Sequence, residues 1–76
     1  MREIDFKMER ENLVQVGDIV NVSEGVLPSA YYYTIEPAIA MSANFRYFER
    51  LKSKTGVVKS INETPRGFFV TVEFDE

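Results

Sequence analysis

The sequence predicts a mainly β protein that folds as a small, partly open barrel of about five strands. Residues 54–61 and 68–74 are rich in β-branched and aromatic side chains, which favour strands. Pro65 and Gly67 lie between them and are typical of the tight turn of a hairpin. A third strand pattern, at residues 16–22, lies upstream. Together the three segments indicate a small curled sheet.

Length and composition predict a single domain covering residues 1–76. A chain of this length is near the lower limit for a hydrophobic core without further support. Apolar residues make up 45% of it, which argues against intrinsic disorder. There is no cysteine, so packing must stabilise the fold. The largest apolar contributors are the phenylalanines Phe6, Phe45, Phe48, Phe68, Phe69 and Phe74.

The first strand is predicted around Ile4, Phe6 and Met8. These residues alternate with charged ones, as a strand with one buried face requires. Four polar residues at 9–12 then predict a turn. Small barrels expose edge strands, so we also expect that Ile4–Met8 can pair with a second copy of the chain. The oligomeric state is not determined by the sequence.

The second strand is predicted from the valines upstream of residue 23. Val14, Val16, Val20 and Val22 share one parity, which would place them on one face of a strand. Gly17 lies among them and predicts a bend or bulge that redirects the strand.

The segment 26–52 is predicted to be a long insertion that carries a short helix at 37–51. Pro37 suits the first helical position. Apolar residues then recur at helical spacing: Ala38, Met41, Phe45, Phe48 and Leu51. Ser42 and Asn44 are mediocre helix formers, so irregular structure is the alternative.

The final hairpin is the clearest element of the pattern. Phe68, Val70, Val72 and Phe74 alternate with residues that face the other way. Gly56, at the start of the preceding strand, suits a sharp corner where a small barrel bends.

These strands and their order resemble the SH3-like barrels. Within that group, residues 54–74 resemble the KOW-type motif, in which a glycine (here Gly56) precedes alternating apolar and basic residues. The resemblance covers residues 17–25 and 54–74. It implies a single SH3-like β domain in which the insertion 26–52 is longer and more helical than usual. In such barrels this loop often shapes the binding surface.

The composition predicts a protein that is not an enzyme and holds no cofactor or metal. Histidine and cysteine are absent, which removes the usual nucleophile–base pairs and nearly all zinc sites. There is no glycine-rich motif for phosphate or a dinucleotide. Carboxylate chemistry would need a pocket that shifts a pKa. We expect the carboxylates to be scattered or, at the C-terminal end, solvated: Asp18, Glu24, Glu36, Glu73, Asp75 and Glu76.

No apolar run approaches the ~20 residues of a membrane-spanning helix. The first residues are charged and alternating, unlike a signal peptide. We therefore expect a cytoplasmic location and no membrane partner.

Four tyrosines are the first candidate for a ligand-binding site: Tyr31, Tyr32, Tyr33 and Tyr47. Consecutive residues of an extended chain cannot all face the core, so at least one of the first three should be partly exposed. Exposed tyrosines suit peptide grooves and base stacking. The simpler interpretation, which the pattern favours, is that Tyr31 and Tyr33 close the open end of the barrel while Tyr32 covers the surface.

Basic residues are the second candidate. Residues 46–59 contain five of them against Glu49 alone, a local charge of +4 within a chain of net charge −3. The five are Arg46, Arg50, Lys52, Lys54 and Lys59. Interleaved with Tyr47 and Phe48, they fit capture of single-stranded nucleic acid. The simpler interpretation is a solvated face of a helix, because the whole chain is acidic.

The sequence thus favours a non-enzymatic module that binds a protein or peptide through the tyrosine-rich insertion. The alternative is an RNA- or DNA-binding module that uses the basic and aromatic segment 46–59.

Overall fold

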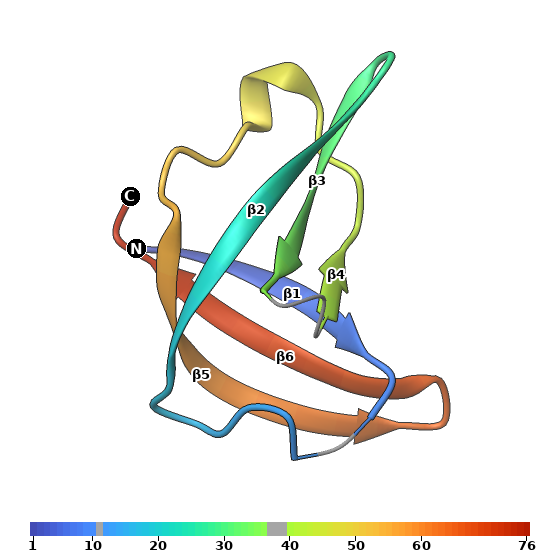
Figure 1. Ribbon diagram of the computed structural model, residues 1–76, viewed down its shortest axis with the longest axis vertical. Coiled ribbons are helices and arrows are strands. Elements are labelled where there is room, and N and C mark those ends of the chain that lie inside the picture. The colour runs from blue at the N-terminus through green and yellow to red at the C-terminus, as the bar shows by residue number, and fades with distance from the viewer. Residues whose placement is uncertain (11, 37–39) are drawn as a thin grey trace.

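The computed structural model describes residues 1–10, 12–36 and 40–76. They form six strands and one short 3-10 turn, η1 (Figure 1). In chain order these are β1 (Arg2–Met8), β2 (Ile19–Leu27), β3 (Ala30–Ile35), β4 (Ala40–Ser42), η1 (Tyr47–Glu49), β5 (Thr55–Thr64) and β6 (Gly67–Phe74). The described residues contain no α-helix.

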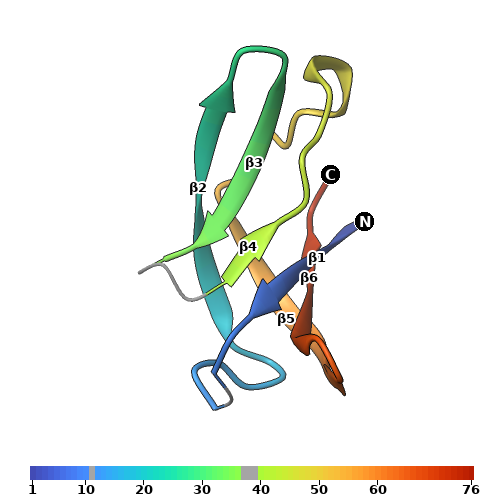
Figure 2. The ribbon, with the colours of Figure 1, turned by 90° about the vertical axis from the view of Figure 1, so that its right-hand side faces the viewer.

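The strands form a closed antiparallel barrel in the order β1-β4-β3-β2-β5-β6 (Figure 2). Its closing seam joins β1 to β6, from Arg2 opposite Phe74 to Met8 opposite Phe68. The prediction of a mainly β barrel is confirmed, but the expected five strands and partial opening are wrong. The short strand β4 is the difference, because it pairs with both β1 and β3 and completes the circle.

Alternate residues of the strands form the core, as the period of two predicts. β1 contributes Ile4, Phe6 and Met8, and the rings of Phe6 and Phe74 lie 6.4 Å apart in a tilted arrangement. The remaining buried apolar residues come from the other strands and two connections: Val14, Val20, Val22, Tyr33, Ile35, Ala40, Leu51, Val58, Val70 and Val72.

The strand predicted at residues 16–22 begins later than expected. β2 starts at Ile19, and Val16 is 64% exposed although it shares the parity of the buried valines. Gly17 has a φ of +95°, which the left-handed region allows glycine, and its N–H donates to the Val58 carbonyl. The Asp18 carboxylate accepts the Gln15 N–H at 2.8 Å. These bonds stabilise a turn that separates Val14 from β2.

The predicted helix at 37–51 is wrong for its described part. Residues 37–39 lie outside the described residues. Ala40–Ser42 form β4, and Phe45 exchanges both backbone hydrogen bonds with Tyr31 at 2.7 and 2.8 Å. Only η1 is helical, and it is one 3-10 turn. The backbone groups that an α-helix would use are bonded to β1 and β3, so tertiary pairing overrides the local helical spacing.

The C-terminal hairpin is confirmed, with β5 and β6 paired from Thr64 opposite Gly67 back to Val57 opposite Glu73. The register shifts between Val58 and Ser60, which marks a bulge.

The strand Ile4–Met8 is not the open edge that the sequence suggested. β1 pairs with β6 along its full length and with β4 from Phe6 to Met8. The hydrogen-bonding groups proposed for pairing with a second copy are therefore largely used inside the barrel.

The β2–β3 hairpin projects beyond one end of the barrel (Figure 1). β2 pairs with β5 only from Ile19 to Asn21, whereas it pairs with β3 from Val22 to Leu27. η1 and the residues that lead to β5 lie beside this projecting hairpin (Figures 1 and 2). The end of the barrel between them holds the candidate site.

The packing around Gly56 gives the first testable prediction. A Cβ at this position would lie 2.6 Å from Val72 Cγ1 and 2.9 Å from the Glu73 carbonyl oxygen. Gly56→Ala should therefore lower the free energy of unfolding by about 1–3 kcal/mol. Asn62→Ala, an exposed change on the same strand, is the control and should stay within about 0.5 kcal/mol. Urea unfolding of both variants measures the difference, and equal midpoints would contradict the predicted clash.

Candidate functional site

A cleft of about 720 Å³ opens between the projecting β2–β3 hairpin and the segment that joins η1 to β5. The hairpin wall consists of Val22, Ser23, Glu24 and Tyr33. The facing wall consists of Tyr47, Phe48, Arg50, Leu51, Lys52, Ser53 and Lys54. The cleft thus contains members of both the tyrosine and the basic candidate sets.

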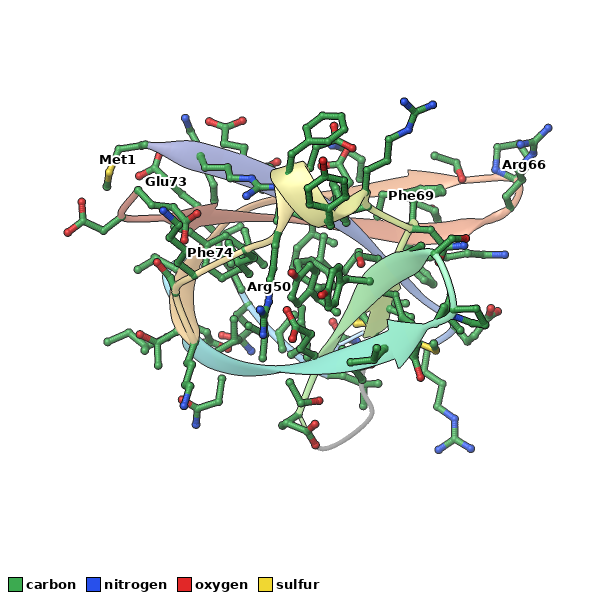
Figure 3. All side chains as sticks on the ribbon, turned by 90° about the horizontal axis from the view of Figure 1, so that it is seen from above. Met1, Arg50, Arg66, Phe69, Glu73 and Phe74 are labelled. Atoms are coloured by element: carbon green, nitrogen blue, oxygen red, sulfur yellow. The ribbon has the colours of Figure 1, made fainter. Side chains whose placement is uncertain are left out.

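A two-pronged ion pair, here called the Glu24–Arg50 clasp, joins the two walls. Arg50 Nε donates to Glu24 Oε2 at 2.9 Å, and Arg50 Nη2 donates to Glu24 Oε1 at 2.8 Å. Two parallel bonds between a guanidinium and a carboxylate fix direction as well as distance. Figure 3 shows Arg50 reaching from the segment after η1 toward β2 across this end of the barrel.

The clasp changes the acidity of Glu24. Hydrogen bonds from Arg50 hold the pKa of the Glu24 carboxyl below its ordinary value. Partial burial opposes this effect, and the Tyr33 hydroxyl adds to it. Glu24 is therefore an anion whose charge is matched within the cleft.

The hydroxyl group of Tyr33 also links the two walls of the cleft. Its side chain is buried (2% exposed), and its hydroxyl accepts the Leu51 N–H at 2.7 Å. The same hydroxyl donates to Glu24 Oε2 at 3.0 Å. Burial is the main reason that the pKa of Tyr33 is raised, with a further increase from Glu24. Tyr33 is thus a structural residue at the floor of the cleft.

Tyr31 contacts the Arg50 side of the Glu24–Arg50 clasp. The Arg50 guanidinium lies 5.0 Å from the centre of the Tyr31 ring, a distance at which a cation is attracted to an aromatic face. Backbone pairing with Phe45 fixes Tyr31 in turn. Arg50 is therefore held by an anion and by an aromatic ring.

Residues from both ends of the chain anchor the facing wall. Arg2 donates to the carbonyls of Glu49 and Arg50. Glu76 Oε1 accepts the N–H groups of Lys52 and Ser53 at 3.0 and 2.7 Å. Burial alone would raise the pKa of Glu76, but the hydrogen bonds from Ser53 and Lys52 and the charge of Arg2 outweigh it, so that this pKa is lowered. The wall is thus tied down by several independent bonds.

The four candidate tyrosines do not form one surface. Tyr33 and Tyr47 line the cleft, Tyr33 as its floor and Tyr47 as a rim residue that is 77% exposed. Tyr31 lies behind Arg50. Tyr32 is on the opposite face of β3, where its ring lies against Gly25, its cross-strand partner.

The five candidate basic residues also lie in different parts of the structure. Arg50, Lys52 and Lys54 line the cleft. Lys59 lies on β5, where its ammonium group binds Glu3 at 2.6 Å and Glu73 at 3.4 Å. Arg46 precedes η1 and is not part of the cleft wall. Within the part of the chain that the structure describes, Lys52 and Lys54 have no carboxylate within ion-pairing distance.

Sequence reasoning missed the role of Glu24, although a signal for it existed. Val20 and Val22 are buried on the inner face of β2, and Glu24 continues their parity. A carboxylate at an inward position needs a charged or hydrogen-bonding partner. Glu76 offered no such signal, because it meets Lys52 and Ser53 only through the fold. The C-terminal carboxylates therefore differ: Glu73 pairs with Lys59 and Glu76 caps a loop.

The arrangement is suited to binding. Two exposed aromatic side chains and two lysines surround a cleft whose own carboxylate is already paired. Among the described residues, no group of three or more acidic side chains is placed to hold a metal ion. No helix in the described ranges is long and apolar enough to cross a membrane.

A matched pair of tyrosine variants tests the floor of the cleft. Tyr33→Phe leaves the buried Leu51 N–H without its acceptor, which should cost about 1–3 kcal/mol of stability. Tyr47→Phe removes the hydroxyl of an exposed ring and should leave the melting temperature unchanged. Thermal unfolding by circular dichroism distinguishes the two, and equal melting temperatures would show that the Leu51 contact is not made.

The clasp also predicts a dependence of stability on pH. Because the pKa of Glu24 is lowered from 4.5, its ionised form stabilises the fold above about pH 4.5. This contribution disappears as the pH falls through the lowered pKa. Glu24→Gln should therefore be less stable than the wild type at pH 7, and the gap should narrow toward pH 3. Arg50→Gln should show the same narrowing, and a gap independent of pH in both variants would argue against the clasp.

The chain has no significant match among protein-family models, curated proteins or solved structures. The small β-barrel fold is consistent with the SH3-like group. The closer resemblance of residues 17–25 and 54–74 to the KOW-type motif stays a prediction.

Proposed function

We propose that this protein is a non-enzymatic binding module that holds an extended segment of another protein in the cleft. The observation that carries the proposal is the exposure of Tyr47 and Phe48, at 77% and 66%. Neither ring belongs to the cluster of buried residues that forms the core. Large exposed aromatics at the rim of a cleft are typical of protein-binding surfaces.

The anchoring of the cleft supports the same function. Tyr47 and Phe48 belong to a short turn whose last residue, Glu49, accepts a hydrogen bond from Arg2, and the next residue, Arg50, binds Glu24. A wall fixed in advance loses little conformational entropy when a partner binds. The two aromatic rings are thus presented on a preorganised support.

The charge of the cleft indicates the chemistry of the partner. Arg50 and Glu24 neutralise each other, which leaves Lys52 and Lys54 as the net charge of the walls. A partner segment that carries acidic side chains beside apolar ones would complement this surface. Because the chain as a whole has a net charge of −3, such a partner would be attracted to this end of the molecule rather than to its surface at large.

Single-stranded nucleic acid is the second candidate, since aromatic rings beside lysines also suit stacking and phosphate contacts. The geometry of the two rings favours protein. Tyr47 and Phe48 are 5.6 Å apart with an interplanar angle of 87°. Consecutive stacked bases are nearly parallel, so two perpendicular rings cannot both stack on them. Edge-to-face packing suits apolar side chains equally well.

The SH3-like resemblance and a cytoplasmic location belong to the same proposal. The small barrel is what supports the resemblance. The segment 26–52 is not an insertion into it, because it supplies the barrel strands β3 and β4, and only part of the cleft lies in this segment.

Selection of peptides from a random display library on the immobilised protein tests the function. Peptides enriched in acidic and apolar residues should be recovered. The double variant Lys52→Glu/Lys54→Glu should weaken their binding at least about tenfold, or ~1.4 kcal/mol. Tyr47→Ala should weaken it as well. Arg66→Glu makes the same kind of charge change on the exposed β5–β6 turn, far from the cleft, and should have little effect (Figure 3).

Two outcomes would contradict the proposal. One is a library that yields no peptide sensitive to the cleft variants. The other is salt-dependent binding of oligo(dT) that Lys52→Glu/Lys54→Glu abolishes while no peptide binds, which would favour the nucleic-acid alternative.

A further inference from the structure

One edge of the projecting hairpin has no strand beside it. β2 pairs with β5 at Ile19–Asn21, and the last bond of this seam runs from the Val22 N–H to the Lys54 carbonyl at 2.8 Å. β5 starts at Thr55, and the chain before it leads away to η1 (Figure 1). The rest of β2, residues 23–27, therefore has no strand on this side, and its first two residues, Ser23 and Glu24, line the cleft.

The direction of the backbone groups along this edge follows from the pairing. In an antiparallel strand, alternate residues direct their N–H and C=O groups to opposite sides. Val22 bonds toward β5, so Glu24 and Val26 direct their backbone groups to the same side. The backbone N–H and C=O groups of residues 23, 25 and 27 point toward β3. Within the described ranges, the backbone groups of Glu24 and Val26 therefore point away from β3, toward a side on which no strand is paired with them.

The side chains beside this edge support the same picture. Val26 shares the inward parity of Val22 and Glu24 but lies beyond the core and is 72% exposed. Lys52 and Lys54 also line the cleft, and the Lys54 carbonyl is bonded to Val22 at the start of this edge. The edge thus combines backbone donors and acceptors with an exposed apolar side chain, and two lysines line the cleft at which it begins.

We propose that the partner segment binds as an added β-strand along residues 23–27 of β2. This inference rests on the proposed function and specifies its mode. Backbone bonds to Glu24 and Val26 hold the added strand, as in other cases of strand addition to a sheet edge. Acidic side chains of the strand then pair with Lys52 and Lys54, and alternate apolar side chains cover Val26 and Phe48.

Charge argues for a different protein as the occupant rather than a second copy of this chain. Pairing of β2 with β2 of another copy would bring the Lys52 and Lys54 pairs of both chains toward one seam. Like charges at close range are destabilising. An acidic segment meets the same seam with opposite charge.

The experiment uses peptides selected from the display library on the wild-type protein. Each backbone N–H of a selected peptide is methylated in turn, which removes one donor and leaves the protein unchanged. Strand addition predicts an alternating result. Methylation at every second position should weaken binding at least about tenfold, and methylation at the positions between should change it about twofold or less.

Amide hydrogen exchange of the protein gives a second readout. On peptide binding, the amides of Glu24 and Val26 should become protected, whereas the amides of residues 23 and 25, already bonded to β3, should change little. Val26→Pro removes one donor of the edge and should weaken binding at least about tenfold, whereas Val26→Ala keeps the donor. If Val26→Pro does not fold, the methylation series and the exchange data still test strand addition.

The outcomes separate this inference from the proposed function. Peptides that bind with uniform sensitivity to methylation and without protection of Glu24 and Val26 would overturn strand addition and leave the binding function intact. Failure to select any peptide would overturn both. Two further results would overturn the proposal that the occupant is an acidic segment of another protein. One is a dimer, seen by sedimentation, that Lys52→Glu disrupts. The other is binding of oligo(dT) that protects the amides of Glu24 and Val26.

Discussion

The pairing of β1 with β6 is the constraint on which the rest of the structure depends. It joins the first and last strands over seven residue pairs and closes the barrel around Phe6, Val70 and Phe74. Pairing the first strand with the last leaves neither of them as an open edge in this chain of 76 residues. Closure also places Arg2 and Glu76 at the same end of the barrel, where both bind the segment that follows η1.

The candidate cleft is a consequence of how this end of the barrel satisfies its polar groups. Glu24 continues the inner row of β2, and a carboxylate there would be costly without partners. Arg50 and the Tyr33 hydroxyl supply them, and Leu51 is drawn into the core by the same hydroxyl. The segment is thereby fixed across the barrel mouth, and Tyr47 has no place in the core. The bonds of Arg50 and Leu51 that fix this segment thus leave the aromatic side chains of η1 exposed at the rim of the cleft.

The basic residues of this segment have two different tasks. Arg50 and Lys59 are paired with carboxylates and stabilise the fold, whereas Lys52 and Lys54 border the cleft. The local charge of +4 in residues 46–59 therefore overstates the charge that a partner would meet. A small surface of two lysines and two aromatic rings beside an unpaired strand edge suits a short extended segment better than a long polyanion.

The sequence by itself determined the strands whose side chains alternate, because that alternation is local: Ile4 to Met8 in β1 and Phe68 to Phe74 in β6 were predictable. Only the tertiary structure decided residues 40–51. Their apolar spacing fits a helix, but strand edges from distant parts of the chain bind their backbone groups instead. The cleft was unpredictable for the same reason. Its walls come from residues 22–24 and 33 on one side and from residues 47, 48 and 50–54 on the other, and their contact depends on long-range pairing that no local pattern encodes.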